Sequence, residues 1–147
     1  MTAPFPHHYE VKLSWPRQGG AELYTAAAPP IAGGAPMAFD GRDTWWSPEH
    51  LLLSSLSLCL MTTFEAIAAK ARLRVLRYDC RAEATLDRSE GGLGFTALGL
   101  HVEIEVNPED AERAPRLLTS AEKHCLVANA LRVPVTLDIA VVTSAAA

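Results

Sequence analysis

The fold of this chain is decided by residues 47–71, which are SPEHLLLSSLSLCLMTTFEAIAAKA. Ser47 is a residue type that caps helix starts, and Pro48 suits the first helical position. Apolar and small side chains then recur at three- and four-residue intervals, which predicts a helix from Pro48 to about Ala71. Because serines, threonines and a glutamate interrupt the run, a membrane span is disfavoured. We expect a core helix that protein surrounds on most sides.

Alternating segments precede this helix. Residues 9–15 and 21–27 are predicted strands, and Gln18, Gly19 and Gly20 supply the turn between them. The prolines and glycines of residues 28–36 predict a loop, because they disrupt strand pairing. Residues 37–39 are the candidate for a third, short strand.

A second set of elements follows the helix. Residues 75–87 and 95–106 are predicted strands of one hairpin, and Asn107-Pro108 begins the next helix. That helix breaks or restarts at a proline and continues over residues 116–130, in one or two pieces. Residues 133–142 are the last predicted strand. The order β-β-(β)-α-β-β-α-β indicates an α+β fold.

Length and composition restrict the class of protein. A chain of 147 residues favours a single domain over residues 1–147, and 49% hydrophobic with 20% charged residues is ordinary for a globular protein. The net charge of −4 gives no reason to expect a nucleic-acid partner. Residues 1–13 lack the continuous apolar stretch of a secretory signal, so we expect a cytoplasmic protein with free thiols and no membrane partner.

Two cysteines are the main candidates for chemistry. Cys59 lies on the predicted core helix, and Cys125 lies 66 residues later on the second helical stretch. Either cysteine alone would be interpreted as a small core residue. Two thiols on helices that could pack together, with a carboxylate at the start of the first helix, indicate thiol redox chemistry. No spacing predicts a metal site, and Cys80, on a predicted strand, is expected to be structural.

Glu49 is the carboxylate at that helix start. It precedes Cys59 by ten residues, about 15 Å along a helix, so it cannot touch the thiol of its own chain. We therefore predict a two-fold dimer with antiparallel central helices and shared active sites. Because a carboxylate raises the pKa of a nearby thiol, a cation must intervene. The candidates are Arg17, which is slightly preferred, and Arg42.

Both cysteine segments resemble those of a known family. Residues 47–52 (SPEHLL) with residues 55–59 (SLSLC), and residues 124–131 (HCLVANAL) followed by a predicted strand, are similar to the signature of the OsmC/Ohr family. This family comprises osmotically inducible protein C and the organic hydroperoxide resistance proteins. The resemblance implies an interwoven homodimer with two antiparallel-type sheets around a pair of central helices.

The resemblance also implies an activity. Family members with both cysteines reduce organic hydroperoxides, with a dithiol, possibly lipoyl, as the reductant and with no bound cofactor or metal. Cys59 would be the peroxidatic thiolate and Cys125 the resolving thiol. Glu49 and Arg17 (or Arg42) would orient the first. A non-catalytic protein that binds a small apolar ligand on the same scaffold is the alternative.

The sequence departs from the family pattern at three places. It has Ser47 where asparagine is common and Leu126 where proline often follows the second cysteine. The long loop of residues 28–46 does not resemble the Ohr branch closely, which favours an OsmC-like branch. Three aromatic residues could line a pocket for alkyl peroxides, although ordinary core or dimer contacts are the preferred explanation for each of them. They are Trp45, Trp46 and Phe64.

Overall fold

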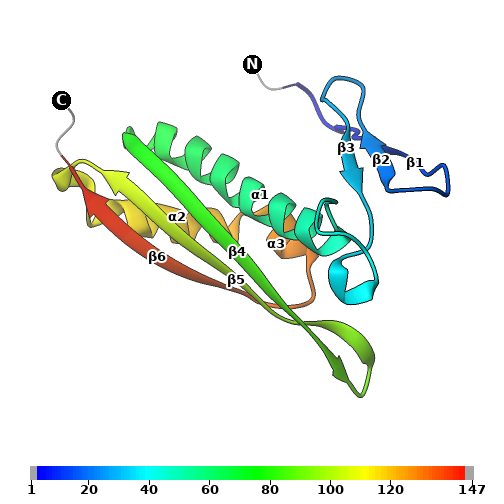
Figure 1. The fold of residues 1–147 in the computed structure, drawn as a ribbon. Helices are drawn as coiled ribbons and strands as arrows, with labels where there is room; N and C mark the ends of the chain where they lie inside the picture. Colours follow the sequence, from blue (N-terminus) through cyan, green and yellow to red (C-terminus); the bar gives the residue numbers. More distant parts are fainter. Residues whose placement is uncertain (1–2, 145–147) are drawn as a thin grey trace. The chain divides into compact units, whose positions relative to one another are not determined.

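Three short strands near the N-terminus form the first sheet of the computed structural model, which describes residues 3–144. They are β1 (Lys12–Ser14), β2 (Ala21–Tyr24) and β3 (Ile31–Gly33), and they pair antiparallel in the order β1-β2-β3 (Figure 1). This sheet belongs to a compact unit of residues 1–51, and residues 52–147 form a second unit. The prediction of a single domain over residues 1–147 stays a prediction.

Two predictions for this region were wrong. The predicted loop 28–36 contains β3, and the predicted strand 37–39 is the 3-10 helix η1 (Met37–Phe39). The prolines precede β3 rather than interrupt it, so the strand can still pair with β2, with Ile31 opposite Leu23. The short helix closes through the Asp40 N–H, which donates to the Met37 carbonyl.

The long helix is confirmed as α1 (Pro48–Lys70). The Ser47 hydroxyl accepts a hydrogen bond from the His50 N–H at 3.2 Å, which satisfies one of the free donors at the helix start. By length and composition alone α1 could span a membrane. However, one face of α1 is buried against the sheet of the second unit, as in the core helix of a soluble protein. The buried residues are Leu56, Leu60, Phe64 and Ala68.

The second sheet has three long strands in the order β4-β5-β6. They are β4 (Val75–Ser89), β5 (Gly92–Val106) and β6 (Val135–Thr143). The predicted hairpin is confirmed, but its turn is tighter than expected, because both strands extend to within two residues of each other and Gly92 takes a positive φ of 100°. β5 and β6 run parallel, so this sheet is mixed rather than antiparallel as predicted.

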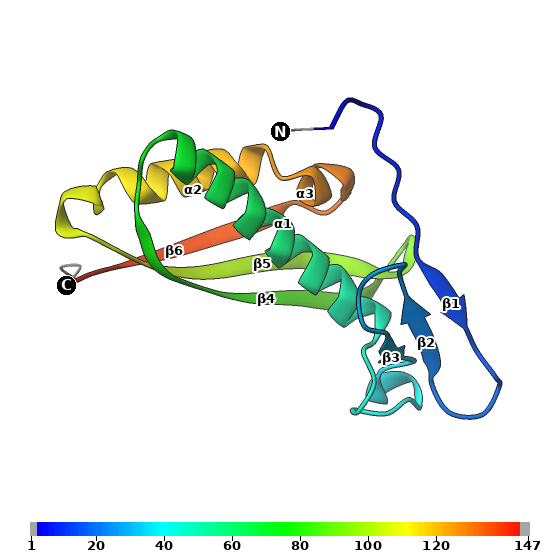
Figure 2. The same ribbon diagram turned by 90° about the horizontal axis from the view of Figure 1, so that it is seen from above.

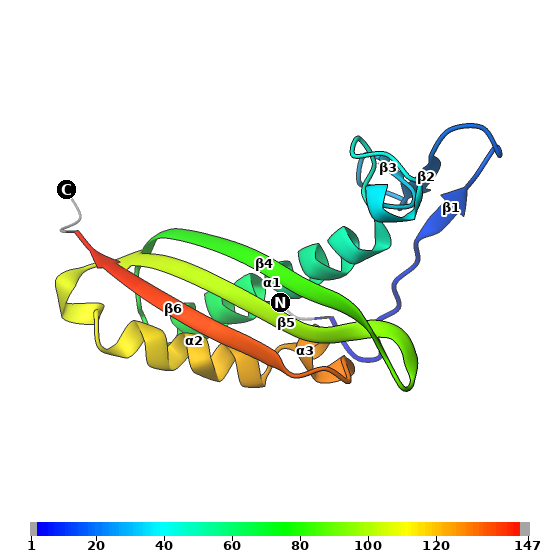
Figure 3. The same ribbon diagram turned by 60° about the horizontal axis from the view of Figure 1, so that its bottom comes forward.

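Helical segments connect β5 to β6. They are η2 (Pro108–Asp110), α2 (Arg113–Lys123) and α3 (Leu126–Ala130). Pro115 lies in the first turn of α2, where a missing N–H breaks no helical hydrogen bond, so a new helix begins near this proline as predicted. The helical stretch consists of two pieces, α2 and α3, which confirms that alternative of the prediction. α2, α3 and residues 52–70 of α1 all lie on one face of the sheet (Figures 2 and 3).

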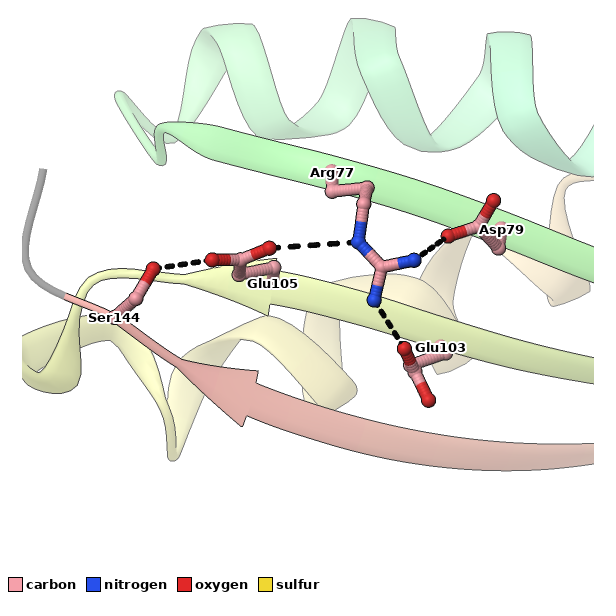
Figure 4. A network of polar contacts seen from close by, with 5 residues as sticks. All are labelled: Arg77, Asp79, Glu103, Glu105 and Ser144. Carbon is pink, nitrogen blue, oxygen red and sulfur yellow. Dashed lines mark hydrogen bonds and ion pairs between the residues drawn. The ribbon is translucent and has the colours of Figure 1, made fainter.

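The two faces of this sheet differ in composition. Alternate residues of β5, from Leu98 to Val106, point toward the helices and form the buried core with α1 and α2. The residues between them lie on the opposite face, which is charged. There Arg77 of β4 binds Asp79, Glu103 and Glu105, and Glu105 accepts a hydrogen bond from the Ser144 hydroxyl (Figure 4).

Candidate active site

Two elements of the second unit position the candidate thiols. Cys59 lies in the middle of α1 and is half-buried, whereas Cys125 is fully buried. Cys125 was predicted to be helical, but it is the extended residue that caps α3, with φ −68° and ψ 112°. Its carbonyl accepts the Asn129 N–H at 3.0 Å. The break between α2 and α3 therefore occurs at the second thiol itself.

The structure places the two thiols close enough to interact. The Cys59 sulfur interacts with the Cys125 thiol, with the Thr63 hydroxyl one turn later in α1, and with two backbone N–H groups. Those N–H groups belong to Leu126 and Val127, which open α3 directly after Cys125. The same break that places Cys125 in the core thus aims its following backbone donors at Cys59.

These contacts make the two thiols chemically unequal. Burial raises the pKa of Cys59, but hydrogen bonds from the Val127 N–H, the Cys125 thiol and the Leu126 N–H outweigh it, so the pKa lies below its ordinary value. Burial also raises the pKa of Cys125, and the nearby Cys59 raises it further. Cys59 is therefore the sulfur that ionises first, and Cys125 is the thiol that donates to it.

Two residues of β4 complete the surroundings of the thiols and were not identified from the sequence as site residues. Tyr78 and Cys80 are separated by two positions, so both point to the helix side of the sheet, where they pack against the core. The Tyr78 ring lies 6.0 Å from the Phe64 ring of α1. Burial raises the pKa of the Cys80 thiol. The period-two spacing of Tyr78 and Cys80 was the available signal.

The predicted orienting residues lie in the first unit, and their role stays a prediction. One carboxylate oxygen of Glu49 is buried and has no hydrogen-bond partner among residues 3–144. Arg17 is exposed in the turn after β1, with a left-handed φ of 68°. Arg42 stacks on the Trp45 ring at 5.3 Å. Within the described chain, Glu49 forms no ion pair with either arginine.

The three aromatic residues proposed for a pocket lie in different surroundings. Phe64 lines a cavity of about 350 Å³ between α1 and β4, together with Met61, Ala68 and Tyr78. Trp45 lines a separate hollow in the first unit, and Trp46 is exposed. Among residues 3–144, no group of histidine, cysteine and acidic side chains could hold a metal ion.

Comparison with known proteins assigns the family. The family model described as OsmC-like protein matches residues 41–140, which include both cysteines of the thiol pair. The chain belongs to the OsmC-like protein family. The family resemblance expected from the two cysteine segments is thus confirmed, as is the α+β fold.

Individual members of the OsmC-like family are distant relatives. Peroxiredoxin OsmC of Escherichia coli K12 is 25% identical over 92 residues, which are 63% of this chain and 64% of that protein. An OsmC-like protein of unknown function from Vibrio cholerae superposes with a TM-score of 0.83 at 19% identity, over 91% of this chain and 99% of the other. An organic hydroperoxide resistance protein from Elizabethkingia anophelis has a TM-score of 0.72 at 19% identity, over 97% and 100%. These two structures establish the shared fold.

Proposed function

We propose that this protein reduces organic hydroperoxides with the Cys59 thiolate and resolves the product through a Cys59–Cys125 disulfide. The feature that carries the proposal is the pairing of a thiol of lowered pKa with a buried second thiol whose hydrogen bond contributes to that lowering. The names of the relatives, peroxiredoxin and organic hydroperoxide resistance protein, support a peroxide-related role of the same type.

The reaction proceeds in three steps. The Cys59 thiolate attacks the terminal peroxide oxygen, so that an S–O bond forms, the O–O bond breaks, and the alkoxide takes up a proton to leave as the alcohol. Cys125 then attacks the sulfenic acid sulfur, forming the disulfide and releasing water. A dithiol, for which a lipoyl group is the candidate, reduces the disulfide by exchange and is itself oxidised.

A second copy of the chain would complete the site. Two apolar side chains next to the thiols are exposed, Leu58 at 59% and Leu126 at 79%. Burying them against a partner would exclude water from the thiolate. The orphan Glu49 oxygen likewise requires a donor, because an unpaired buried polar atom is costly. We therefore propose the shared-site homodimer, in which Glu49 and Arg17 (or Arg42) orient Cys59 from across the interface.

The cavity beside Phe64 supports an apolar substrate. Its volume of about 350 Å³ and its mostly apolar lining suit an alkyl group better than they suit hydrogen peroxide, although Glu65 also lines it and neither thiol does. The reaction requires reduced thiols before each turnover, which a reducing cytoplasm maintains. A cytoplasmic location accordingly forms part of the proposal.

Thiol counting tests the reaction. Reduced protein is mixed with one equivalent of cumene hydroperoxide, and free thiols are titrated after denaturation. We expect loss of two of the three thiols per chain in the wild type, loss of both remaining thiols in the control Cys80→Ala, and no loss in Cys59→Ser. Cys125→Ala should lose one thiol and accumulate a dimedone-reactive sulfenic acid. An unchanged thiol count in the wild type would favour the alternative, a binding protein for small apolar ligands.

Mixed dimers test the shared site. If Glu49 serves the thiol of the other copy, chains carrying Glu49→Gln and chains carrying Cys59→Ser complement each other after co-refolding. Random pairing makes half of the molecules hybrid, each with one intact site, so activity should recover to about a quarter of the wild-type value. Recovery no greater than the summed activities of the separate variants, or a monomer in sedimentation at micromolar concentration, would contradict the shared site.

A further inference from the structure

One hollow of the first unit has no role in the thiol chemistry. Its volume is about 410 Å³, within the range of about 300–1,000 Å³ that small-molecule sites occupy. The side chains that line it are apolar or aromatic except for one carboxylate. The larger ones are Leu13, Trp15, Asp40 and Trp45, and the other lining residues are alanines and glycines. We call this space the tryptophan hollow.

Trp45 is fixed in the wall of the hollow by the backbone around it. The next residue, Trp46, is hydrogen-bonded beside β3: its N–H donates to the Ala32 carbonyl at 2.9 Å, and its carbonyl accepts the Gly34 N–H at 3.0 Å. A Cβ atom at Gly20 would lie 2.8 Å from Cε2 of the Trp45 indole, and one at Gly34 would lie closer still to Cε3. Only glycine therefore permits the ring to lie this close to both backbone segments.

The second indole and the carboxylate are also held in place. The Trp15 Nε1–H donates to the Gly19 carbonyl at 3.4 Å, which ties this indole to the turn between β1 and β2. Asp40 ends η1 with a left-handed φ of 59°, and its N–H donates to the Met37 carbonyl at 3.2 Å. The Asp40 carboxylate forms no ion pair or hydrogen bond with residues 3–144, so it can serve as a counter-ion.

These groups favour a positively charged ligand. The face of an indole ring attracts a cation that lies within about 6 Å of the ring centre. Trp45 shows this attraction, because the Arg42 guanidinium carbon lies 5.3 Å from its ring centroid. Arg42 does not line the hollow, so it approaches the ring from outside. Among residues 3–144, Asp40 is the only charged residue that lines the hollow, so the site as a whole selects for positive charge.

The scarcity of hydrogen-bond acceptors restricts the kind of cation. A primary ammonium group has three N–H donors and is strongly hydrated, whereas Asp40 is the only side-chain acceptor in the lining. Burying such a group would leave donors unpaired, which costs free energy. A methylated ammonium group has few or no N–H donors, so it can leave water for an aromatic site at a smaller cost.

We propose that the tryptophan hollow binds a small organic cation with a methylated ammonium group, which contacts the indoles of Trp15 and Trp45 and has Asp40 as its counter-ion. All of the lining residues belong to the unit of residues 1–51. The site does not depend on the proposed thiol peroxidase function, because it contains none of the cysteines or orienting residues of that reaction.

Fluorine NMR tests the site with choline as the probe. The chain has three tryptophans, so protein labelled with fluorotryptophan gives three signals, which single Trp→Phe variants assign. Choline chloride replaces NaCl at constant ionic strength. We expect saturable shifts of Trp15 and Trp45, whereas Trp46, which does not line the hollow, should keep its shift. The neutral isostere 3,3-dimethylbutanol should bind about tenfold more weakly, because two cation–π contacts are lost.

Asp40→Asn tests the counter-ion without changing the shape of the site. Asparagine tolerates the left-handed conformation of residue 40 and keeps the size of the side chain. We expect choline binding to weaken about threefold to fivefold, as for one exposed ion pair, while binding of the neutral isostere stays the same. The control Asp43→Asn removes an exposed carboxylate that does not line the hollow, and it should change neither affinity. Trp15→Leu, at a side chain that is 58% exposed, should also weaken choline binding.

Each outcome either supports or overturns the site. Saturable binding that is selective for choline over its isostere, and that Asp40→Asn weakens but Asp43→Asn does not, supports it. Equal affinities for choline and the isostere, or an unchanged choline affinity in Asp40→Asn, would overturn it. So would the absence of a saturable shift at either indole, as expected if a second copy of the chain covered the hollow. None of these results bears on thiol counting, which tests the peroxidase separately.

Discussion

The two faces of the β4–β5–β6 sheet show how one set of strands can carry two kinds of chemistry. On β4, Arg77, Asp79 and Arg81 alternate with Tyr78 and Cys80. The first group faces away from the helices, where charges pair in water. The second group faces the core, where a few donors act on sulfur atoms. The comparison indicates that burial, rather than the number of nearby charges, determines where neighbouring groups can change the reactivity of a side chain.

The outer face holds its charges by mutual pairing across the strands. Arg77 binds one acidic residue on its own strand and two on β5 (Figure 4). His101 of β5 links both neighbouring strands: its Nε2 lies 2.8 Å from Glu83 of β4, and its Nδ1 lies 3.0 Å from Asp138 of β6. All of these groups have access to water, so solvent and salt screen their interactions.

On the helix side of the sheet, uncharged hydrogen-bond donors act on the sulfur atoms. The pKa of Cys59 is lowered by two backbone N–H groups and by neighbouring thiol and hydroxyl groups, without a cation in the second unit. We expect such donors to become more effective where a partner copy excludes competing water from the thiolate. A cation from the arginine candidates would add to an effect that the backbone already produces.

The largest expected effect is on stability, and it distinguishes a buried position of β5 from an exposed one. Leu100 is 1% exposed on the inner face, whereas Leu93 is 52% exposed near the hairpin end. We expect Leu100→Ala to reduce the free energy of unfolding by about 2–5 kcal/mol through lost burial and the cavity that remains. The control Leu93→Ala should change it by no more than about 0.5 kcal/mol. Urea denaturation followed by circular dichroism measures both, and similar losses would contradict the assignment of the inner face as the core.

The fold could be predicted largely because its periodic segments are long. The helix from Pro48 and the hairpin strands extend over many residues, so their apolar spacing was unambiguous. β3 was missed because it has only three residues and follows two prolines, and its pairing with β2 is a tertiary contact. The parallel pairing of β5 and β6 likewise depends on where α2 and α3 lead the chain.

The next expected effect concerns the three thiols on the helix side of the sheet, Cys59, Cys80 and Cys125. Because the pKa of Cys59 is lowered and those of Cys80 and Cys125 are raised, Cys59 has the largest thiolate fraction at pH 7. We expect iodoacetamide to modify Cys59 first, with a pH midpoint below that of a free thiol. Cys125→Ala removes one donor, so the Cys59 midpoint should rise and its rate at pH 7 should fall by about threefold to tenfold.

Mass spectrometry of alkylated peptides identifies each cysteine in this experiment. Cys80→Ala is the matched control, because Cys80 is not among the groups that interact with Cys59, and it should leave the Cys59 midpoint in place. Equal reactivity of the three cysteines would show that their surroundings do not shift their pKa values in different directions.

The candidate site was predictable in its residue types and less so in its geometry. Two cysteines on helical segments could be identified from motif spacing. The break at Cys125, which aims the N–H groups of Leu126 and Val127 at Cys59, could not, because it depends on how α3 packs. Tyr78 was not identified because a tyrosine on a strand, at core spacing, is an ordinary core residue.

The smallest expected effect is on the outer face. Arg77→Ala removes the cation shared by Asp79, Glu103 and Glu105, leaving three neighbouring carboxylates that repel one another. In low salt the urea midpoint should fall, but by much less than in Leu100→Ala, because exposed ion pairs contribute little. In 1 M NaCl the Debye length is about 3 Å, so the difference from wild type should nearly vanish. The control Arg81→Ala, which loses only the Glu83 contact, should show a smaller loss still. If the loss of stability in Arg77→Ala persists in 1 M NaCl, the contribution of this network does not depend on charges that salt screens. The two faces would then differ in polarity but not in how strongly solvent screens their interactions.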